Sequence, residues 1–479
     1  MVRQSLTDSY SELRAMLLHG ELSVEELVLH YINVAESHQH LNVYIDIFKD
    51  EALRRAQDLD EKLKNDPDSM GPLFGLVVSI KDVICFKDHQ ISAGSKILQN
   101  FSSSYHATAI KRLLDADAII IGRVNCDEFA MGSTNENSYY GPTHNGDNPD
   151  LIPGGSSGAS AVSVQIRSCM VALGSDTGGS VRQPAAFCGV IGFKPSYGRI
   201  SRYGLIAYAS SFDQIGILSR DVDNVAKVLE CIAGPDEFDS TATMQPVDNY
   251  SDYSAQGKLK IAYIDNAVSH DSLSTENKRL FHGFADRLRQ EGHMLEGISF
   301  SLLDYLVPTY YILTTAEASS NLSRYDGIRY GYRSDDAKDI ETLYTQSRGE
   351  GFGLEVKRRI MLGTFVLSAG YYDAYYKKAQ IVRNMIKHEI EQILEEYDLI
   401  MMPCTTGKAW KLGEITQDPV EMYLSDIFTV LANLTGQPAI SIPFQAENDT
   451  PDHYGVQFLG KYLGEKALLT FINNSLKLA

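Results

Sequence analysis

The sequence predicts an α/β protein built around one large, mostly buried sheet. Helical and strand-like patterns alternate along the 479 residues, and the chain is 44% hydrophobic and 22% charged. These values are ordinary for a globular protein of layered helices and strands. Several of the predicted strands are short apolar runs, such as residues 73–80 (LFGLVVSI) and 399–404 (LIMMPC). Short apolar runs bounded by turns are typical of buried strands.

The predicted elements follow from local signals in chain order. Ser23-Val-Glu-Glu26 is a capping box that opens an amphipathic helix to about residue 36. A charged helix near 48–65 precedes the strand 73–80. The turn-rich stretch 234–258 is expected to be a surface excursion and not a domain boundary. We further expect helices at 106–115, 158–167, after 221, 274–291, 306–323, 366–396, 422–435 and at the end, and strands at 118–121, 169–174, 190–193, 259–264, 399–404, 438–444 and 454–460.

Composition and net charge indicate in which compartment the protein is expected and what it can bind. No apolar run approaches the roughly 18–20 residues of a membrane span, and the first residues, MVRQSLTDSYSELR, lack a signal-peptide core. The six cysteines are scattered without a C-x-x-C pair, so we expect them to be reduced and mostly buried. The net charge of −19 repels phosphate backbones, so another polypeptide would hold most of any nucleic acid. We expect a cytoplasmic protein that does not bind membranes.

Three residues far apart in the chain carry the strongest chemical signal. Lys81 follows the apolar run 73–80, Ser156 lies in PGGSSGAS, and Ser180 lies in GSDTGGSVRQP. A serine hydroxyl is a weak nucleophile that needs a base, and no histidine lies near either serine in the sequence. The pattern predicts a serine nucleophile that is activated by lysine.

The predicted chemistry places a physical demand on each of these residues. Lysine is a base only when neutral, so its pKa must fall from about 10.4 toward about 7–8. Burial at the end of a strand disfavours the ammonium form and lowers the pKa in this way. A second serine between the lysine and the nucleophile can pass the proton in both directions. The glycines beside Ser180 let backbone N–H groups approach the acyl carbon as an oxyanion hole.

Other known functional motifs match this sequence poorly. Residues 154–158 match G-x-S-x-G, but no strand precedes them as the α/β-hydrolase motif requires. Residues 176–178 are a single D-T-G, whereas aspartic proteases need two carboxylates. Neither glycine-rich loop matches a phosphate-binding motif, and His388-Glu389 lacks a second histidine at zinc-ligand spacing. We therefore expect neither a metal nor a cofactor in this chain.

The segments VSIKD, PGGSSGAS and GSDTGGSVRQPAAFCGVIGFKPSYGRIS resemble the amidase signature family, and the resemblance runs from about residue 8 to 470. It implies the amidase-signature fold, in which a large mixed β-sheet is covered by helices on both faces. It also implies a single domain over 1–479, with an N-terminal helical segment (1–66), a core with the catalytic residues (67–225) and a remainder with substrate-binding residues (226–479).

The resemblance also implies a role for each matching site residue. Lys81 would be the base, Ser156 the bridging serine on a cis peptide after Gly155, and Ser180 the nucleophile. One departure is Ala159, where the family more often has glycine, and it affects only the detail of that loop. The oxyanion hole would come from the backbone around Thr177, Gly178 and Gly179.

Four further segments narrow the resemblance to one group within the family. FAMGSTNENSYYGPTHN, AEASSNLSRYDGIRYGYR, EVKRRIMLGTF and SAGYYDAYYKKAQIVR resemble the glutaminase (A) subunits of tRNA-dependent amidotransferases. In those heterotrimers the ammonia passes to a B subunit, which holds most of the aminoacyl-tRNA and uses ATP and Mg²⁺ to convert Glu-tRNA(Gln) to Gln-tRNA(Gln). A small C subunit joins the other two. The sequence leaves open whether Asp-tRNA(Asn) is also a substrate.

Free glutamine needs a partner for each of its charged groups. Its α-carboxylate calls for a guanidinium and its α-ammonium for a carboxylate, because both groups are desolvated on binding. By position in the resembling motifs, we expect Arg359 to bind the carboxylate and Asp426 the ammonium. Tyr310 would assist from the helix 306–323. Arg358 remains a rival for Arg359, since neighbours on a helix point about 100° apart.

Two other classes of function remain open at this point. A freestanding amide hydrolase of the same family, acting on simple or fatty amides, would have an apolar acyl channel and no need for Arg359 and Asp426. A scaffold that has kept the fold without activity is disfavoured by the intact set of Lys81, Ser156 and Ser180.

Overall fold

The computed structural model describes residues 6–254, 257–414, 419–445 and 452–475. Its strands form one mixed sheet of eleven strands in the order β1-β3-β2-β4-β6-β5-β10-β11-β9-β7-β8. β2 is parallel to β3 and β4, and β7 is parallel to β8 and β9, whereas the other neighbours are antiparallel. The strands are β1 (Tyr44–Ile47), β2 (Val77–Lys81), β3 (Ile119–Val124), β4 (Val171–Asp176), β5 (Ile191–Lys194), β6 (Gln214–Ser219), β7 (Lys260–Ile264), β8 (Met294–Ile298), β9 (Leu399–Pro403), β10 (Ala439–Gln445) and β11 (His453–Leu459).

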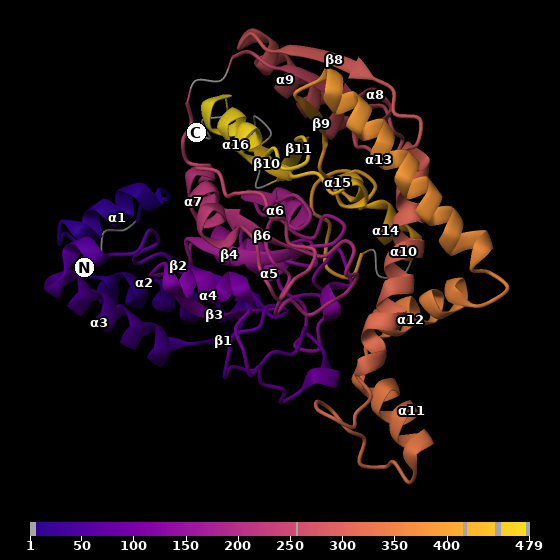
Figure 1. The fold of residues 1–479 in the computed structure, drawn as a ribbon, viewed down its shortest axis with the longest axis horizontal. Helices are drawn as coiled ribbons and strands as arrows, with labels where there is room; N and C mark the ends of the chain where they lie inside the picture. Colours follow the sequence, from indigo (N-terminus) through magenta and orange to yellow (C-terminus); the bar gives the residue numbers. More distant parts are fainter. Residues whose placement is uncertain (1–5, 255–256, 415–418, 446–451, 476–479) are drawn as a thin grey trace.

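Helices surround this sheet. Figure 1 shows α1 to α3 gathered at one end of the molecule, and α10 to α13 along the opposite side. The described helices are α1 (Tyr10–Leu18), α2 (Val24–Ser37), α3 (Lys49–Asn65), α4 (Thr108–Asp115), α5 (Gly158–Gln165), α6 (Arg182–Phe187), α7 (Val222–Ile232), α8 (Asp265–Val268), α9 (Thr275–Gln290), α10 (Leu306–Asn321), α11 (Ile340–Gly351), α12 (Leu354–Leu367), α13 (Lys378–Glu396), α14 (Pro419–Leu424), α15 (Val430–Thr435) and α16 (Glu465–Ser475). The predicted mixed α/β architecture is confirmed.

Most predicted elements lie within a few residues of their expected positions, and the capping box of Ser23 and Glu26 forms both of its hydrogen bonds. The long helical stretch predicted over 366–396 is interrupted near its start. α12 ends at Leu367, and helical backbone resumes with a π-helical turn at Asp373–Lys377 that leads directly into α13 from Lys378. The helix predicted over 422–435 is likewise two helices, α14 and α15.

Three glycines on adjacent strands allow the loop after β4 to lie directly on the sheet. A Cβ at Gly192 would stand 2.6 Å from Ala185 Cβ, and one at Gly216 would stand 2.9 Å from Val181 Cγ2. A Cβ at Gly174 would also meet Val181, at 3.0 Å. A Cβ atom does not approach another heavy atom to less than about 3 Å in a close-packed interior. The glycines therefore position the start of α6, directly after Ser180.

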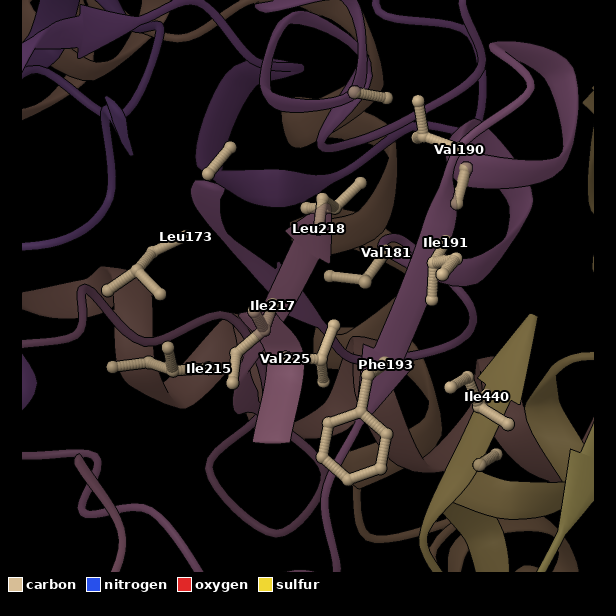
Figure 2. Close-up of a cluster of buried hydrophobic side chains, with 14 of the residues drawn as sticks. Leu173, Val181, Val190, Ile191, Phe193, Ile215, Ile217, Leu218, Val225 and Ile440 are labelled. Carbon is tan, nitrogen blue, oxygen red and sulfur yellow. The ribbon is translucent and has the colours of Figure 1, made fainter. Parts of the chain in front are cut away.

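The strands also contribute large apolar side chains to a buried cluster. Leu173 of β4, Ile217 of β6 and Phe193 of β5 pair across the sheet, and all three are fully buried. Figure 2 shows them in one cluster with Val225 of α7. Burying side chains of this size stabilises the fold by roughly 1.5–3 kcal/mol each. This buried packing stabilises β4, the strand that leads into the loop of Ser180.

Close packing of α12 on α10 fixes which face of α12 turns inward. A Cβ at Gly363 would stand 1.9 Å from Thr315 O, so only glycine allows this approach of the two backbones. Arg359 lies one turn before Gly363 and therefore on the same face. The inward face of α12 also includes Val356 and Val366, both buried.

The prediction for the cysteines is confirmed, because all six are free and only Cys231 is not fully buried. Within the described ranges, no helix is long and apolar enough to cross a membrane.

Candidate active site

Lys81 lies at the end of β2 with its side chain completely buried. Its Nζ donates to three hydroxyls: Ser156 Oγ at 2.7 Å, Ser157 Oγ at 2.9 Å and Ser175 Oγ at 3.0 Å. Hydroxyl oxygens can accept from an ammonium and can donate to a neutral amine. The surroundings of Lys81 therefore suit both protonation states.

Burial lowers the pKa of Lys81 to about 8, although nearby Cys126, Asp127, Asp176 and Asp213 act in the opposite direction. At pH 8 about half of the molecules would carry a neutral amine, which is the form that can accept a proton. The predicted fall of the lysine pKa toward about 7–8 agrees with this value.

Ser156 follows a cis peptide bond between Gly155 and Ser156, as the resemblance implied. A Cβ at Gly155 would stand 2.1 Å from Asp127 Oδ2, so the side chain of Asp127 occupies the space that any larger residue would need. The N–H of Gly155 donates to Gln183 Oε1 at 2.9 Å. These contacts hold the Ser156 hydroxyl toward Lys81.

Ser180 lies beside this turn, because its carbonyl accepts a hydrogen bond from the N–H of Ser157 at 3.1 Å. The residue is 9% exposed, and its hydroxyl has no hydrogen-bond partner in the described part of the chain. Gly179 has φ +124°, and a Cβ there would stand 2.2 Å from Thr429 Oγ1. Only glycine fits this position.

The loop before Ser180 is held by two carboxylates. The N–H of Gly179 donates to Asp176 Oδ1 at 2.9 Å, and Thr177 Oγ1 donates to Asp213 Oδ1 at 2.7 Å. Because the N–H of Gly179 is already directed to Asp176, the N–H groups of Thr177 and Gly178 are the freer donors of the predicted oxyanion hole. Neither of these two has an acceptor among the described residues.

Arg182 holds in place Asp176, one of the two carboxylates that support this loop. Its guanidinium donates to both Asp176 oxygens, at 3.0 and 3.1 Å, and also to Asn433 Oδ1 and Gln457 Oε1, at 2.7 Å each. Burial alone would raise the pKa of Asp176, but Arg182 brings it down to about 2. Asp176 therefore stays ionised and is a fixed hydrogen-bond acceptor, because a buried charge is tolerated when it is fully paired.

Arg359, and not Arg358, faces the interior. Arg359 is 2% exposed, and its Nε donates to Glu355 Oε1 at 2.8 Å. Its guanidinium lies 5.6, 5.3 and 5.6 Å from the ring centroids of Tyr208, Tyr311 and Tyr423. The side chain of Arg358 is 40% exposed and pairs with the other oxygen of Glu355. A buried arginine among aromatic rings can bind an anion strongly, because stacking and low dielectric strengthen its interactions.

Asp426 lies close to this arginine. Tyr311, whose ring contacts Arg359, donates its hydroxyl hydrogen bond to Asp426 Oδ2 at 2.9 Å, and Ser133 Oγ contacts both carboxylate oxygens at 3.0 Å. Burial raises the pKa of Asp426 to about 7, although Tyr311, Ser133 and Arg359 act to lower it. Tyr311 thus stands between a buried cation and a buried carboxyl group.

The two charges also lie next to the loop that carries Ser180. A Cβ at Gly178 would stand 2.5 Å from the Tyr310 hydroxyl, so the Tyr310 ring packs directly against that loop. Thr429, on the turn that follows Asp426, donates to Gly178 O at 2.6 Å. The structure thus links Tyr310 and Asp426 to the loop of Ser180, and Tyr311 links Arg359 to Asp426. Their roles toward a substrate remain predictions.

Sequence reasoning missed several side chains that contact these residues. Ser157 could have been noticed, because it is the second serine of the GSSG segment. Glu355 could also have been noticed, because it lies four residues before Arg359 on the same helix. The others carry no local signal, because each meets its partner through a contact distant in sequence. They are Ser133, Ser175, Tyr208, Tyr311 and Tyr423. Among the described residues, no group of histidine, cysteine, aspartate and glutamate side chains could hold a metal ion.

Comparison with known proteins gives a consistent result. The family model described as Amidase matches residues 26–469. A protein of Chlorobium phaeobacteroides, named as the A subunit of Glutamyl-tRNA(Gln) amidotransferase, is 49% identical over 438 residues, which cover 91% of this chain and 92% of that protein. A protein of the same name from Fusobacterium nucleatum subsp. nucleatum is 48% identical over 461 residues, with 96% and 94% covered.

Solved structures agree with these sequence comparisons. The structure of the Glutamyl-tRNA(Gln) amidotransferase A subunit from Thermotoga maritima is 36% identical, has a TM-score of 0.76, and matches 93% of this chain and 90% of its own. A bacterial aryl acylamidase of the amidase signature family has a TM-score of 0.85 at 19% identity, with 98% of this chain and 96% of its own covered. At that identity the likeness concerns the fold alone.

Proposed function

This chain belongs to the Amidase family, and we propose that it is the glutamine-hydrolysing component of a tRNA-dependent amidotransferase. The observation that carries the proposal is the pair of buried, oppositely charged side chains, Arg359 and Asp426, near the loop of Ser180. Arg359 is paired with Glu355 but keeps Nη2 without an acceptor, and Asp426 has no cationic partner among the described residues. A simple or fatty amide offers no charged group to either of them. Free glutamine offers an α-carboxylate and an α-ammonium.

The proposed mechanism begins with a neutral Lys81. Lys81 Nζ accepts the Ser156 proton, and Ser156 Oγ takes the proton from Ser180 Oγ as that oxygen attacks the side-chain amide carbon of glutamine. The N–H groups of Thr177 and Gly178 would stabilise the negative charge on the carbonyl oxygen. Ser156 then returns a proton to the leaving nitrogen, and ammonia departs. Water, deprotonated along the same route, releases glutamate and restores Ser180.

Substrate binding uses the two charges in different ways. Arg359 Nη2 has no acceptor in the described ranges, so it is available to the α-carboxylate of glutamine. Asp426 would accept the α-ammonium, with Tyr311 and Ser133 holding the carboxylate in place. Tyr310 would border the bound side chain where it reaches Gly178. Both charged groups on the α-carbon of glutamine would thus be bound by buried side chains before Ser180 attacks the amide at the other end.

The partners in the proposal are those of the related amidotransferases. The B subunit would hold the aminoacyl-tRNA, use ATP and Mg²⁺, and receive the ammonia, and the small C subunit would complete the heterotrimer. The net charge of −19 supports this division, because an acidic chain is repelled by phosphate backbones. Whether Asp-tRNA(Asn) is amidated as well as Glu-tRNA(Gln) would depend on the partner.

Ammonia release from a panel of amides tests this proposal. L-Glutamine, L-asparagine and simple amides would be compared with and without the B and C subunits. We expect activity largely confined to L-glutamine, and stimulation when the partners, ATP and Glu-tRNA(Gln) are present. Fast hydrolysis of simple amides without partners, with glutamine a poor substrate, would instead establish a freestanding amidase and remove the roles of Arg359 and Asp426.

The pKa of Asp426 gives a prediction for glutamine binding. Only the ionised carboxylate attracts the α-ammonium, and with a pKa of about 7 its ionised fraction falls about tenfold between pH 8 and pH 6. We therefore expect the KM for glutamine to rise about tenfold over this range, since affinity scales with the binding-competent fraction. Steady-state ammonia release at several pH values measures the KM.

Glutaramate, which is glutamine without its ammonium group, is the matched control for this pH prediction. Its KM should not rise as the pH falls, and Asp426→Asn should remove the pH dependence for glutamine while raising the KM throughout. A glutamine KM that stays flat from pH 8 to pH 6 in the unmodified protein would contradict the assignment.

A further inference from the structure

Tyr208, in the loop between β5 and β6, holds the Arg359 guanidinium through its hydroxyl. Arg359 Nη1 donates to Tyr208 Oη at 2.9 Å, and Tyr208 Oη donates to Thr314 Oγ1 at 3.0 Å. Tyr208 is 1% exposed. A phenol has one proton and accepts through its lone pairs. Because the proton is committed to Thr314, a lone pair faces Arg359, and the hydroxyl is fixed from both sides.

The backbone of Tyr208 is held by the same carboxylate that supports the loop of Ser180. Its N–H donates to Asp213 Oδ2 at 2.9 Å, while Asp213 Oδ1 accepts from Thr177 Oγ1 at 2.7 Å. Asp213 is almost completely buried. One side chain therefore anchors both the tyrosine that contacts Arg359 and the loop that precedes the nucleophile.

Two contacts together set the direction in which the guanidinium points. Nε of Arg359 is directed to Glu355 and Nη1 to Tyr208. The guanidinium is a rigid planar fork, so fixing two of its nitrogens also fixes the third. Nη2 has no acceptor among the residues that the structure describes, so it remains for a ligand. Glu355 is a charged partner, whereas the Tyr208 hydroxyl contributes only a hydrogen bond that orients the guanidinium.

We propose that Tyr208 is a positioning residue for substrate selection: its hydroxyl orients Arg359 so that Nη2 meets a substrate carboxylate. The inference rests on the proposed function, because it takes Arg359 as the receptor for the α-carboxylate of glutamine. It also concerns only one of the two charged groups on the α-carbon of glutamine. The other group, the α-ammonium, depends on Asp426, which is held by Ser133 and Tyr311 and not by Tyr208.

Because different residues hold the partners of the two α-substituents, the proposal can be tested with analogues that lack one or the other. 4-Aminobutanamide is glutamine without its α-carboxylate, and glutaramate is glutamine without its α-ammonium. In Tyr208→Phe, a buried charged donor loses its acceptor, and an interaction of that type changes binding by about tenfold or more. We expect the preference for glutamine over 4-aminobutanamide, as the ratio of kcat/KM values, to fall about tenfold in this variant. The preference for glutamine over glutaramate should stay unchanged.

Tyr250→Phe is a matched control for this experiment. Tyr250 is also buried, its hydroxyl accepts from Arg199 Nε at 2.6 Å, and its ring lies 5.6 Å from that guanidinium. It contacts none of the site residues. Both variants remove a tyrosine hydroxyl from a buried arginine, so a comparable decrease in Tm is expected. Only Tyr208→Phe should change the substrate preference.

The outcomes separate this inference from the proposed function. If the unmodified protein does not prefer glutamine over 4-aminobutanamide, Arg359 is not the carboxylate receptor and both proposals fail. If it does, and Tyr208→Phe keeps the same preference, the role of Tyr208 is wrong while the proposed function stands. An equal loss of preference against both analogues would also overturn it, since that result means general damage to the site.

Discussion

We expect Ser180→Ala to abolish glutamine hydrolysis, with a loss in kcat of at least about 10⁴-fold, because the proposed acyl bond forms on the Ser180 hydroxyl. The stability of the protein should hardly change. The Ser180 hydroxyl has no hydrogen-bond partner in the described part of the chain, so its removal breaks no contact there. Ammonia release and Tm, measured on the same preparation, give both values. Adding hydroxylamine to the unmodified protein should yield γ-glutamyl hydroxamate, which reports the acyl intermediate, and the variant should yield none.

Ser104→Ala is a suitable control for the loss of a serine hydroxyl, because Ser104 is exposed. It should leave both the kcat and the hydroxamate yield unchanged. If Ser180→Ala protein still forms the hydroxamate, the nucleophile must be another serine. Ser156 and Ser157 would then be the next to test, since both contact Lys81.

The predicted site residues that carry a physical signal in the sequence are those with strong local constraints. Lys81 ends an apolar strand, and Ser156 and Ser180 are flanked by glycines that the structure needs. Side chains at Gly155 and Gly179 would meet Asp127 and Thr429 at 2.1 and 2.2 Å. A loop under such steric constraint accepts few residue types, so its motif can be recognised from the sequence alone. The buried position of Lys81 follows from the same strand pattern.

The residues that were missed depend on contacts between distant segments. Ser133 reaches Asp426 across 293 positions, and Tyr208 reaches Arg359 across 151. No periodicity or turn signal records such a contact, because it arises only when the sheet and helices are assembled. Asp426 and Arg359 themselves were found by their place in resembling motifs and not by any physical signal.

A physical signal in the sequence could have decided between Arg358 and Arg359. Gly363 is a poor helix former, and its presence in α12 marks the face that must approach another backbone. Arg359 lies four residues before it, on that face, whereas Arg358 lies off it. The same reasoning fails for 366–396, because the helical periodicity continues across the interruption between α12 and α13 although the helix does not.

Replacing Lys81 by methionine should lower kcat by about 10³- to 10⁴-fold, since the proton of the nucleophile then has no base. The pH profile identifies the cause. In the unmodified protein kcat should rise with pH until the amine is largely neutral, and it should fall about tenfold per pH unit below the pKa of about 8. Lys81→Met should lose this rise and show a low, nearly flat profile at saturating glutamine. Asp426 does not interfere, because its titration changes the KM and not the rate of the bound complex.

Lys194→Met separates the loss of a base from the loss of a buried amine. Lys194 is as completely buried as Lys81, and burial lowers its pKa to about 7. Among the described residues, its Nζ donates only to the carbonyls of Pro195 and Gln437, at 2.8 and 2.6 Å, and contacts no hydroxyl from which to take a proton. This variant should lower the Tm and keep the rise of kcat through pH 8. If the rise survives in Lys81→Met, or disappears in Lys194→Met, the base has been assigned to the wrong lysine. A depressed pKa is common to both, and only the contact with Ser156 makes one of them a base.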